Sequence, residues 1–107
     1  MMAVPKPQRP VRGTKACRQH MARVAQLPCC VCGHPGPSIV HHVCHDRYSQ
    51  SRASDLDTIP LCAAHHDATS PVGLHHAPAA WRARHGADHG YLPAVRAAIH
   101  ALEGDAE

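Results

Sequence analysis

The chain has 107 residues, of which 12 are His and 11 are Lys or Arg, and its formal net charge is +3 with neutral His. The hydrophobic class makes up 44% of the residues, but only 23 of its members are larger than Ala or Cys, and Phe is absent. A single domain is expected at this length, and it has little material for a core. We therefore expect a source of stability besides packing.

The six cysteines can supply that stability, either as disulfides or as metal ligands. The first residues contain no apolar segment of the signal-peptide type, and no apolar run approaches the ~20 residues that span a bilayer. We therefore expect a soluble, cytoplasmic protein with reduced thiols, in which cysteine binds metal. The positive charge is compatible with an anionic partner but does not require one.

Residues 1–13 are rich in proline and basic side chains and have almost nothing to bury, so we interpret them as a flexible basic arm before a domain at 14–107. Thr14 is expected to cap a helix that Pro28 ends. Hydrophobic periodicity, β-branched content and the placing of Pro and Gly predict the remaining elements. In chain order these are a turn at 33–37, a strand at 38–43, a polar loop at 44–56, a strand at 57–60, a short helix at 62–68, a helix at 78–85 closed by Gly86 and a helix at 93–102 closed by Gly104. This order predicts an α+β fold.

Two pairs of residues have the spacing of metal ligands. Cys29 and Cys32 are placed so that one tight turn directs two thiolates at a single ion, and Cys62 and His65 have the same spacing. Together they predict a closed Cys3His site that holds a structural zinc. Buried free cysteines are the alternative interpretation, which two matched pairs disfavour. The remaining cysteines, Cys17, Cys30 and Cys44, lack paired spacing and are interpreted as small core residues.

Pairs of histidines offer further chemistry. His41 and His42 are adjacent on the predicted strand, so their side chains point to opposite faces and cannot do the same job at one site. One can bind a metal while the other acts on a substrate beside it. On the short helix, His66 diverges from His65 by about 100°, so it can face away from the zinc and towards the strand.

The order of these motifs resembles that of a known enzyme family. Cys-x-x-Cys at 29–32, His-His at 41–42 and Ile-Pro-Leu-Cys-x-x-His-His at 59–66 are similar to the zinc-stapled HNH endonucleases of the ββα-metal (His-Me finger) fold. The resemblance covers residues 17–85. The stretch at 81–86 looks most like the phage-encoded and prophage-encoded group that includes the Ref recombination-enhancement nucleases.

This resemblance implies a small ββα-metal core flanked by helices and a role for each matching residue. It makes His42 the general base that takes a proton from water, and it makes His41 and His66 ligands of a catalytic divalent ion. Asp57 stands where the family normally has Asn, the residue that orients the base or braces the strands. Its carboxylate can still accept a hydrogen bond and fix the ring of His42.

The implied activity is metal-dependent hydrolysis of DNA phosphodiester bonds with low sequence specificity. The catalytic ion would be Mg2+, Mn2+ or another divalent transition metal, and imidazole ligands favour Mn2+, Co2+ or Ni2+ at least as much as Mg2+. His75 or His76 could provide a third ligand. DNA is favoured over RNA by the resemblance alone, which also suggests a recombinase filament as a partner. The oligomeric state stays open.

Phosphate contacts are expected from the basic arm, from Arg18 and Arg23 of the first helix, and from the loop at 47–52. Tyr48 is the only aromatic residue of that loop, which gives base stacking little support.

Two other functions are compatible with these motifs. One is a non-catalytic, zinc-stabilised module that binds DNA or a protein, because Asp57 departs from the family pattern and the third metal ligand is undecided. The other is metal buffering or sensing, which the histidine pairs at 41–42, 65–66 and 75–76 suggest. Buffering tracts usually form low-complexity runs, and these pairs lie on distinct predicted elements.

Overall fold

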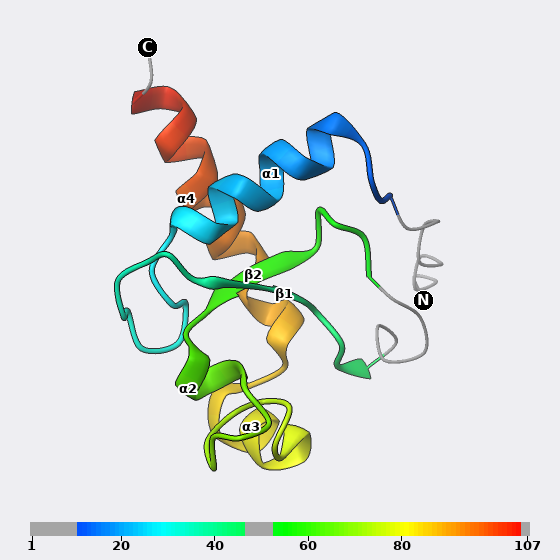
Figure 1. Cartoon of the computed structure of the whole chain (residues 1–107), viewed down its shortest axis with the longest axis vertical. Helices are drawn as coiled ribbons and strands as arrows, with labels where there is room; N and C mark the ends of the chain where they lie inside the picture. Colours follow the sequence, from blue (N-terminus) through cyan, green and yellow to red (C-terminus); the bar gives the residue numbers. More distant parts are fainter. Residues whose placement is uncertain (1–10, 47–52, 106–107) are drawn as a thin grey trace, which may run out of the picture.

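The computed structural model describes residues 11–46 and 53–105, and it is a small α+β fold around one two-stranded sheet. The helices lie on both sides of this sheet (Figure 1). In chain order the elements are α1 (Lys15–Gln26), β1 (Ile39–His42), β2 (Thr58–Leu61), α2 (Ala63–His66), α3 (Pro78–His85), the 3-10 helix η2 (Asp88–Tyr91) and α4 (Leu92–Asp105).

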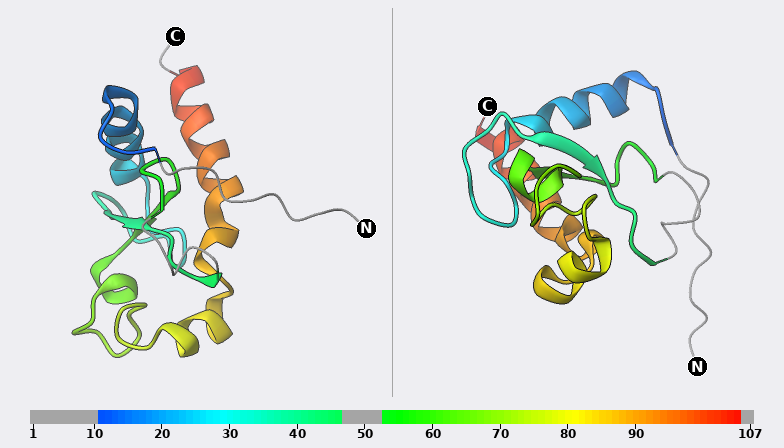
Figure 2. Two further views of the ribbon diagram at one scale, coloured as in Figure 1. Left: turned by 90° about the vertical axis from the view of Figure 1, so that its right-hand side faces the viewer. Right: turned by 60° about the horizontal axis from the view of Figure 1, so that its bottom comes forward.

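The two strands are antiparallel, and His41 pairs with Ile59 while His42 pairs with Thr58. β2 is buried along its whole length, because α1 packs against both strands and α4 and η2 also contact β2. In the views of Figures 1 and 2, α1 lies on one side of the sheet, α2 and α3 lie on the other, and α4 extends from the α3 end towards the α1 end. The short helix α2 directly follows β2 in the chain and packs next to β1.

The core is as small as the composition predicts. Trp81 of α3 is buried, whereas Tyr91 is only partly buried. The other large buried apolar residues are Val24, Leu27, Val43, Ile59, Leu61, Leu74, Leu92, Val95 and Ile99. Among the described helices, none is long and apolar enough to cross a membrane.

Several predicted helix ends are confirmed. Thr14 caps α1, and its side-chain oxygen accepts the N–H of Cys17 at 3.1 Å. α3 has the predicted bounds, and Gly86 follows it with a φ of +84°, a conformation that favours glycine.

Other boundaries differ from the prediction. The second strand is shifted by one residue, because pairing with β1 sets its limits at Thr58 and Leu61. α4 begins at Leu92, where η2 runs directly into it, and it continues through Gly104 to Asp105. Glycine inside a helix costs only about 1 kcal/mol relative to alanine, so Gly104 alone does not end α4.

The last residues of the predicted basic arm are held against the loop before β2. The N–H of Val11 donates to Ser54 Oγ at 2.9 Å, and the carbonyl of Val11 accepts the N–H of Asp55 at 2.9 Å. The N–H of Gly13 donates to Asp55 Oδ2 at 2.8 Å. Residues 1–10 of the arm and the predicted contact loop at 47–52 lie outside the described residues.

A tight turn after α2 depends on Gly73. A Cβ at this position would lie 2.0 Å from the backbone oxygen of Asp67, far inside van der Waals contact. The residues that follow this turn bond back to α2, since the N–H of Leu74 donates to the His65 carbonyl at 2.9 Å and the N–H of His75 to the His66 carbonyl at 3.2 Å. Gly73 thus allows the chain to return alongside α2.

We predict that Gly73→Ala lowers the free energy of unfolding by about 1–3 kcal/mol or more, because backbone atoms cannot move aside as a flexible side chain can. Gly90→Ala is the matched control, since a Cβ there meets nothing within 4 Å. Urea denaturation of both variants measures the difference. Equal stability of the two would show that the turn is not tight.

Candidate metal centres

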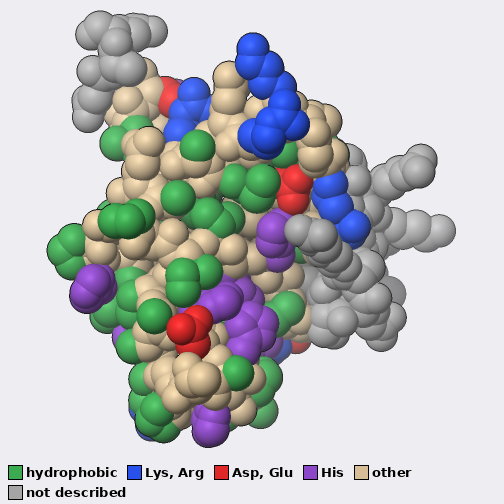
Figure 3. Space-filling view, in the orientation of Figure 1, with side chains coloured by type: hydrophobic (Ala, Val, Ile, Leu, Met, Phe, Trp, Pro, Cys, Tyr) green, Lys and Arg blue, Asp and Glu red, His purple; other side chains and the backbone are tan. Residues whose placement is uncertain are grey.

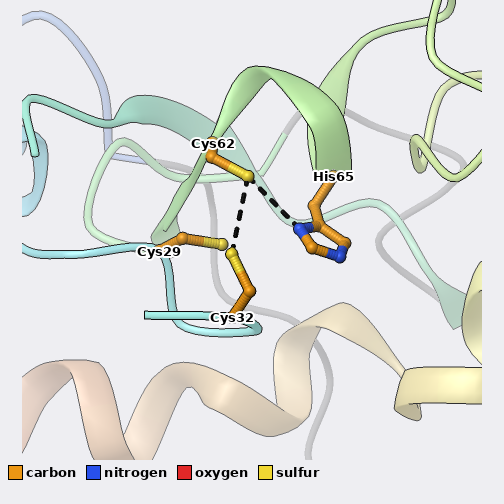
Figure 4. Close-up of side chains that lie close together, drawn as sticks. All are labelled: Cys29, Cys32, Cys62 and His65. Carbon is orange, nitrogen blue, oxygen red and sulfur yellow. Dashed lines mark hydrogen bonds between the residues drawn. The ribbon is translucent and has the colours of Figure 1, made fainter. Parts of the chain in front are cut away.

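The four predicted zinc ligands converge on one point between β2, α2 and the turn after α1. The sulfur atoms of Cys29, Cys32 and Cys62 and the ring of His65 point towards one another (Figure 4), and their ligand atoms all lie within 4.8 Å of each other. Cys32 Sγ is 3.8 Å from Cys62 Sγ, and Cys62 Sγ is 3.2 Å from His65 Nδ1. Two thiolates bound to a tetrahedral zinc ion at about 2.3 Å would lie about 3.8 Å apart. The set therefore fits a zinc ion.

Local backbone structure directs each pair of ligands. Gly33 adopts a φ of +77°, and its N–H donates to the Cys29 carbonyl at 2.8 Å, which closes the Cys-x-x-Cys turn. The N–H of Cys30 donates to the carbonyl of Pro60 at 3.0 Å and ties this turn to β2. Cys62 is the N-cap residue of α2, so His65 lies about one helical turn further on.

The electrostatics of the cluster also suit a cation. Burial raises the pKa of the Cys29 thiol, but the backbone N–H groups of Cys32, Cys62 and Val31 outweigh it and bring the pKa below its usual value. The pKa of Cys62 is raised by burial and by the neighbouring Cys32 and Cys29 sulfur atoms. One divalent cation would relieve this repulsion between thiolates.

A second group of potential ligands forms where β1 meets α2 and the segment after Gly73. The rings of His41, His66 and His75 meet edge to face, with centroid distances of 5.4 Å between His41 and His66, 5.3 Å between His41 and His75, and 4.7 Å between His66 and His75. Their ligand nitrogens lie within 4.8 Å of one another. In Figure 3, histidine side chains gather on the lower half of the face shown. We call His41, His66 and His75 the trihistidine group.

The trihistidine group includes both predicted ligands of the catalytic ion, His41 and His66, and one of the two residues left open as a third ligand. His75 belongs to it, whereas the Nδ1 atom of His76 lies 3.1 Å from the carbonyl of Ala68. Burial, together with the neighbouring His66 and His41 rings, lowers the pKa of His75 and so favours its neutral form. Neutral imidazole is the form that binds a metal.

Carboxylates hold two of these rings. Nε2 of His41 lies 2.9 Å from Asp88 Oδ2, and Nδ1 of His66 lies 2.9 Å from Asp67 Oδ1. An ionised carboxylate only accepts hydrogen bonds, so the bonded nitrogen carries the proton and the other nitrogen of a neutral ring keeps its lone pair. Carboxylate partners of this kind are characteristic of metal-binding histidines.

Asp88 is fully buried and was not predicted as a site residue. Its carboxylate accepts hydrogen bonds from the His41 ring and from the backbone N–H groups of Cys44 at 2.8 Å and His45 at 3.1 Å. Burial raises its pKa, but these hydrogen bonds outweigh the effect and hold the pKa well below its usual range. Its charge therefore fastens η2 to the end of β1. No sequence motif links Asp88 to a strand so distant in the chain.

On the other face of β1, the ring of His42 contacts Asp55 rather than the predicted Asp57. Nε2 of His42 lies 2.8 Å from Asp55 Oδ1, and the ring is 23% exposed while the carboxylate is buried. Asp57 instead accepts a hydrogen bond from Arg96 of α4 at 2.7 Å. The N–H of Asp57 donates to the carbonyl of Ser54 at 2.9 Å and closes a turn. This turn separates the two carboxylates and directs them to different partners.

The three unpaired cysteines pack as predicted. Cys17 is fully buried, and Cys30 and Cys44 are partly buried against the core.

We predict that Cys32→Ala abolishes zinc binding and unfolds the domain, whereas His42→Ala keeps both zinc and fold. A structural zinc contributes about 10–16 kcal/mol in small zinc domains, which is as large as the whole stability of a typical domain. Zinc content by atomic emission and helix content by circular dichroism measure the two effects. A folded, zinc-free Cys32→Ala protein would contradict the structural role.

The comparisons with known proteins concern almost the whole chain. Residues 2–100 match the model of a family described as "Protein of unknown function (DUF968)". No curated protein and no solved structure matches the chain. A match of this extent, over the segment that contains both groups of ligands, assigns the family: the chain belongs to DUF968.

Proposed function

We propose that this protein is a metal-dependent endonuclease of the HNH type that hydrolyses DNA phosphodiester bonds with low sequence specificity. One observation carries the proposal: the trihistidine group and the His42–Asp55 pair lie on opposite faces of one strand, next to a Cys3His set. The order β1, β2, α2 is compatible with the ββα-metal core that the motif resemblance implies, and it places His41 on β1 and His66 on α2. The resemblance in motif order and this arrangement of side chains support the same function.

His42 is suited to the role of general base. Its ring is held by a buried carboxylate and remains partly exposed, so solvent and substrate can reach it. The free nitrogen of a neutral imidazole can take a proton from the attacking water. Asp55 would orient the ring and stabilise the imidazolium that forms, because Asp55 is itself fixed by the N–H of Gly13.

The trihistidine group provides three imidazole ligands and leaves further positions for water and for phosphate oxygens. A divalent ion bound there would stabilise the negative charge that develops on the phosphoryl oxygens and on the leaving 3′ oxygen. Asp88 and Asp67 would keep His41 and His66 in the tautomer that presents a lone pair. The Cys3His set would hold a zinc ion with a structural role only, since its four protein ligands leave no open position.

DNA contact is proposed for the basic side chains of α1. Arg18 is exposed and donates to the carbonyl of Gly13 at 3.0 Å, while Arg23 lies 3.5 Å from Glu103 in an exposed ion pair. Such a pair is weak and can be exchanged for a phosphate contact. A recombinase filament that delivers the DNA is a further element of the proposal, drawn from the resemblance alone.

We predict that the purified protein nicks plasmid DNA only when a divalent ion is added, with Mn2+, Co2+ or Ni2+ at least as effective as Mg2+. His42→Ala should lower the nicking rate about 10²- to 10⁴-fold, the usual contribution of a general base. His100→Ala, on the exposed side of α4, is the control and should nick like the wild type.

Failure of the wild type to cleave single-stranded, duplex and partner-bound DNA with all of these ions would remove the nuclease proposal. The protein would then be a zinc-stabilised module that binds DNA or a protein without catalysis. Activity with Mg2+ but with none of the transition metals would contradict the ligand assignment, because imidazole favours the latter.

A second prediction separates the two aspartates of the loop before β2. Asp55→Asn should lower the nicking rate at least about tenfold, because the buried partner of the base loses its charge. Asp57→Asn should leave the rate unchanged, since it loses only an exposed ion pair with Arg96 worth about 1 kcal/mol or less. Equal rates for the two variants would contradict the role of Asp55, and zinc content would verify that both are folded.

A further inference from the structure

Cys44 and the buried carboxylate of Asp88 both lie close to the ring of His41. Its Sγ atom lies 4.0 Å from Nε2 of His41, the same nitrogen that lies 2.9 Å from Asp88 Oδ2. The ligand atoms of these three residues lie within 4.8 Å of one another. Neither the structural zinc nor the proposed catalytic centre uses Cys44.

We propose that His41, Cys44 and Asp88 form an inhibitory site for a thiophilic divalent cation such as Zn2+. The binding of the ion rests only on these three residues, whereas the inhibition rests on the proposed function. We call this set the Cys44 site.

The ligand chemistry selects the ion. One thiolate, one imidazole and one carboxylate are ligands that zinc accepts, whereas Mg2+ binds oxygen ligands and keeps its waters. When the ion binds, the Cys44 thiol gives up its proton to solvent and its sulfur forms a bond to zinc. The His41 proton moves from Nε2 to Nδ1, so the ring stays neutral. The two negative charges of Cys44 and Asp88 then balance the charge of the ion.

The site combines two buried ligands with one partly exposed ligand. The ring of His41 and the carboxylate of Asp88 are almost completely enclosed, with side-chain exposures of 2% and 0%. Oδ1 of Asp88 is held by the N–H of His45, which fixes the carboxylate before any ion arrives. Cys44 is partly exposed, so an ion can enter along its side chain.

His41 belongs to both the Cys44 site and the trihistidine group, so the two cannot bind an ion at the same time. A neutral imidazole has a single lone pair, so His41 can serve one ion at a time. When Nε2 donates to Asp88, the single lone pair of a neutral His41 is on Nδ1. In the Cys44 site it belongs to Nε2. Zinc at Cys44 would therefore deprive the proposed catalytic centre of a ligand.

The test begins with the protein carrying its structural zinc. Cys44 and Cys30 are matched thiols, both partly buried and both with a pKa raised to about 12 by burial, and Cys30 belongs to no group of ligands among the described residues. Alkylation of each is followed by mass spectrometry, with and without further ZnCl2. We expect added Zn2+ to slow alkylation of Cys44 by about tenfold or more without affecting Cys30, and Mg2+ to affect neither.

Zinc affinity provides the second measurement. Competition with a chromophoric chelator should show that Cys44→Ser weakens binding of added Zn2+ by about tenfold or more, whereas Cys30→Ser leaves it unchanged. Undiminished affinity in Cys44→Ser, or equal alkylation of Cys44 with and without Zn2+, would overturn the site. The alkylation measurement uses the wild type, so it decides the matter even if Cys44→Ser folds poorly.

Inhibition is measured as the ratio of Mn2+-supported nicking rates with and without Zn2+. This ratio should approach one in Cys44→Ser and stay low in Cys30→Ser. If zinc inhibits Cys44→Ser as strongly as the wild type, the regulatory role is wrong. If no protein nicks DNA at all, the proposed function fails, while alkylation and affinity still decide whether zinc binds at Cys44.

Discussion

His65 links the two groups of ligands, and much of the structure depends on its position. Its Nδ1 atom belongs to the Cys3His set, while its backbone oxygen accepts the N–H of Leu74 at 2.9 Å and the indole N–H of Trp81 at 3.1 Å. A zinc ion bound by this set would therefore fix α2, the returning segment that carries His75, and α3 at once. In a chain with so few large apolar residues, such a cross-link replaces contacts that a larger core would provide.

The strand β1 separates two kinds of chemistry because its side chains alternate between faces. His41 points into the interior, where Asp88 receives its N–H, and His42 points to the half-exposed side, where Asp55 does the same. Each histidine thus has a carboxylate from a different part of the chain. The buried ring is suited to binding an ion and the accessible ring to moving a proton, although their sequence environment is the same.

Features that depend on local spacing could be predicted from the sequence, and features that depend on distant contacts could not. The Cys3His ligands and the cap at Thr14 follow from short-range patterns, and the structure has them as predicted. The choice of Asp55 over Asp57 depends on a turn whose direction is set by the pairing of β2 with β1. Asp88 lies in a 3-10 helix that no periodicity indicates, because its conformation is held by bonds to β1 and the residues after it.

Part of the histidine content has a physical explanation in how this chain pairs its carboxylates. Among the described residues, four aspartates contact an imidazole: Asp88 with His41, Asp55 with His42, Asp67 with His66, and Asp46 with His89. Lysine or arginine could also satisfy these carboxylates, but neither would keep a lone pair. A neutral imidazole donates one N–H to the carboxylate and retains a basic nitrogen on its other side. Several such nitrogens that converge can hold a metal ion, and one that stands alone near solvent can act as a base. The residue type that pairs with the aspartates of this small fold therefore also supplies the groups for its proposed chemistry.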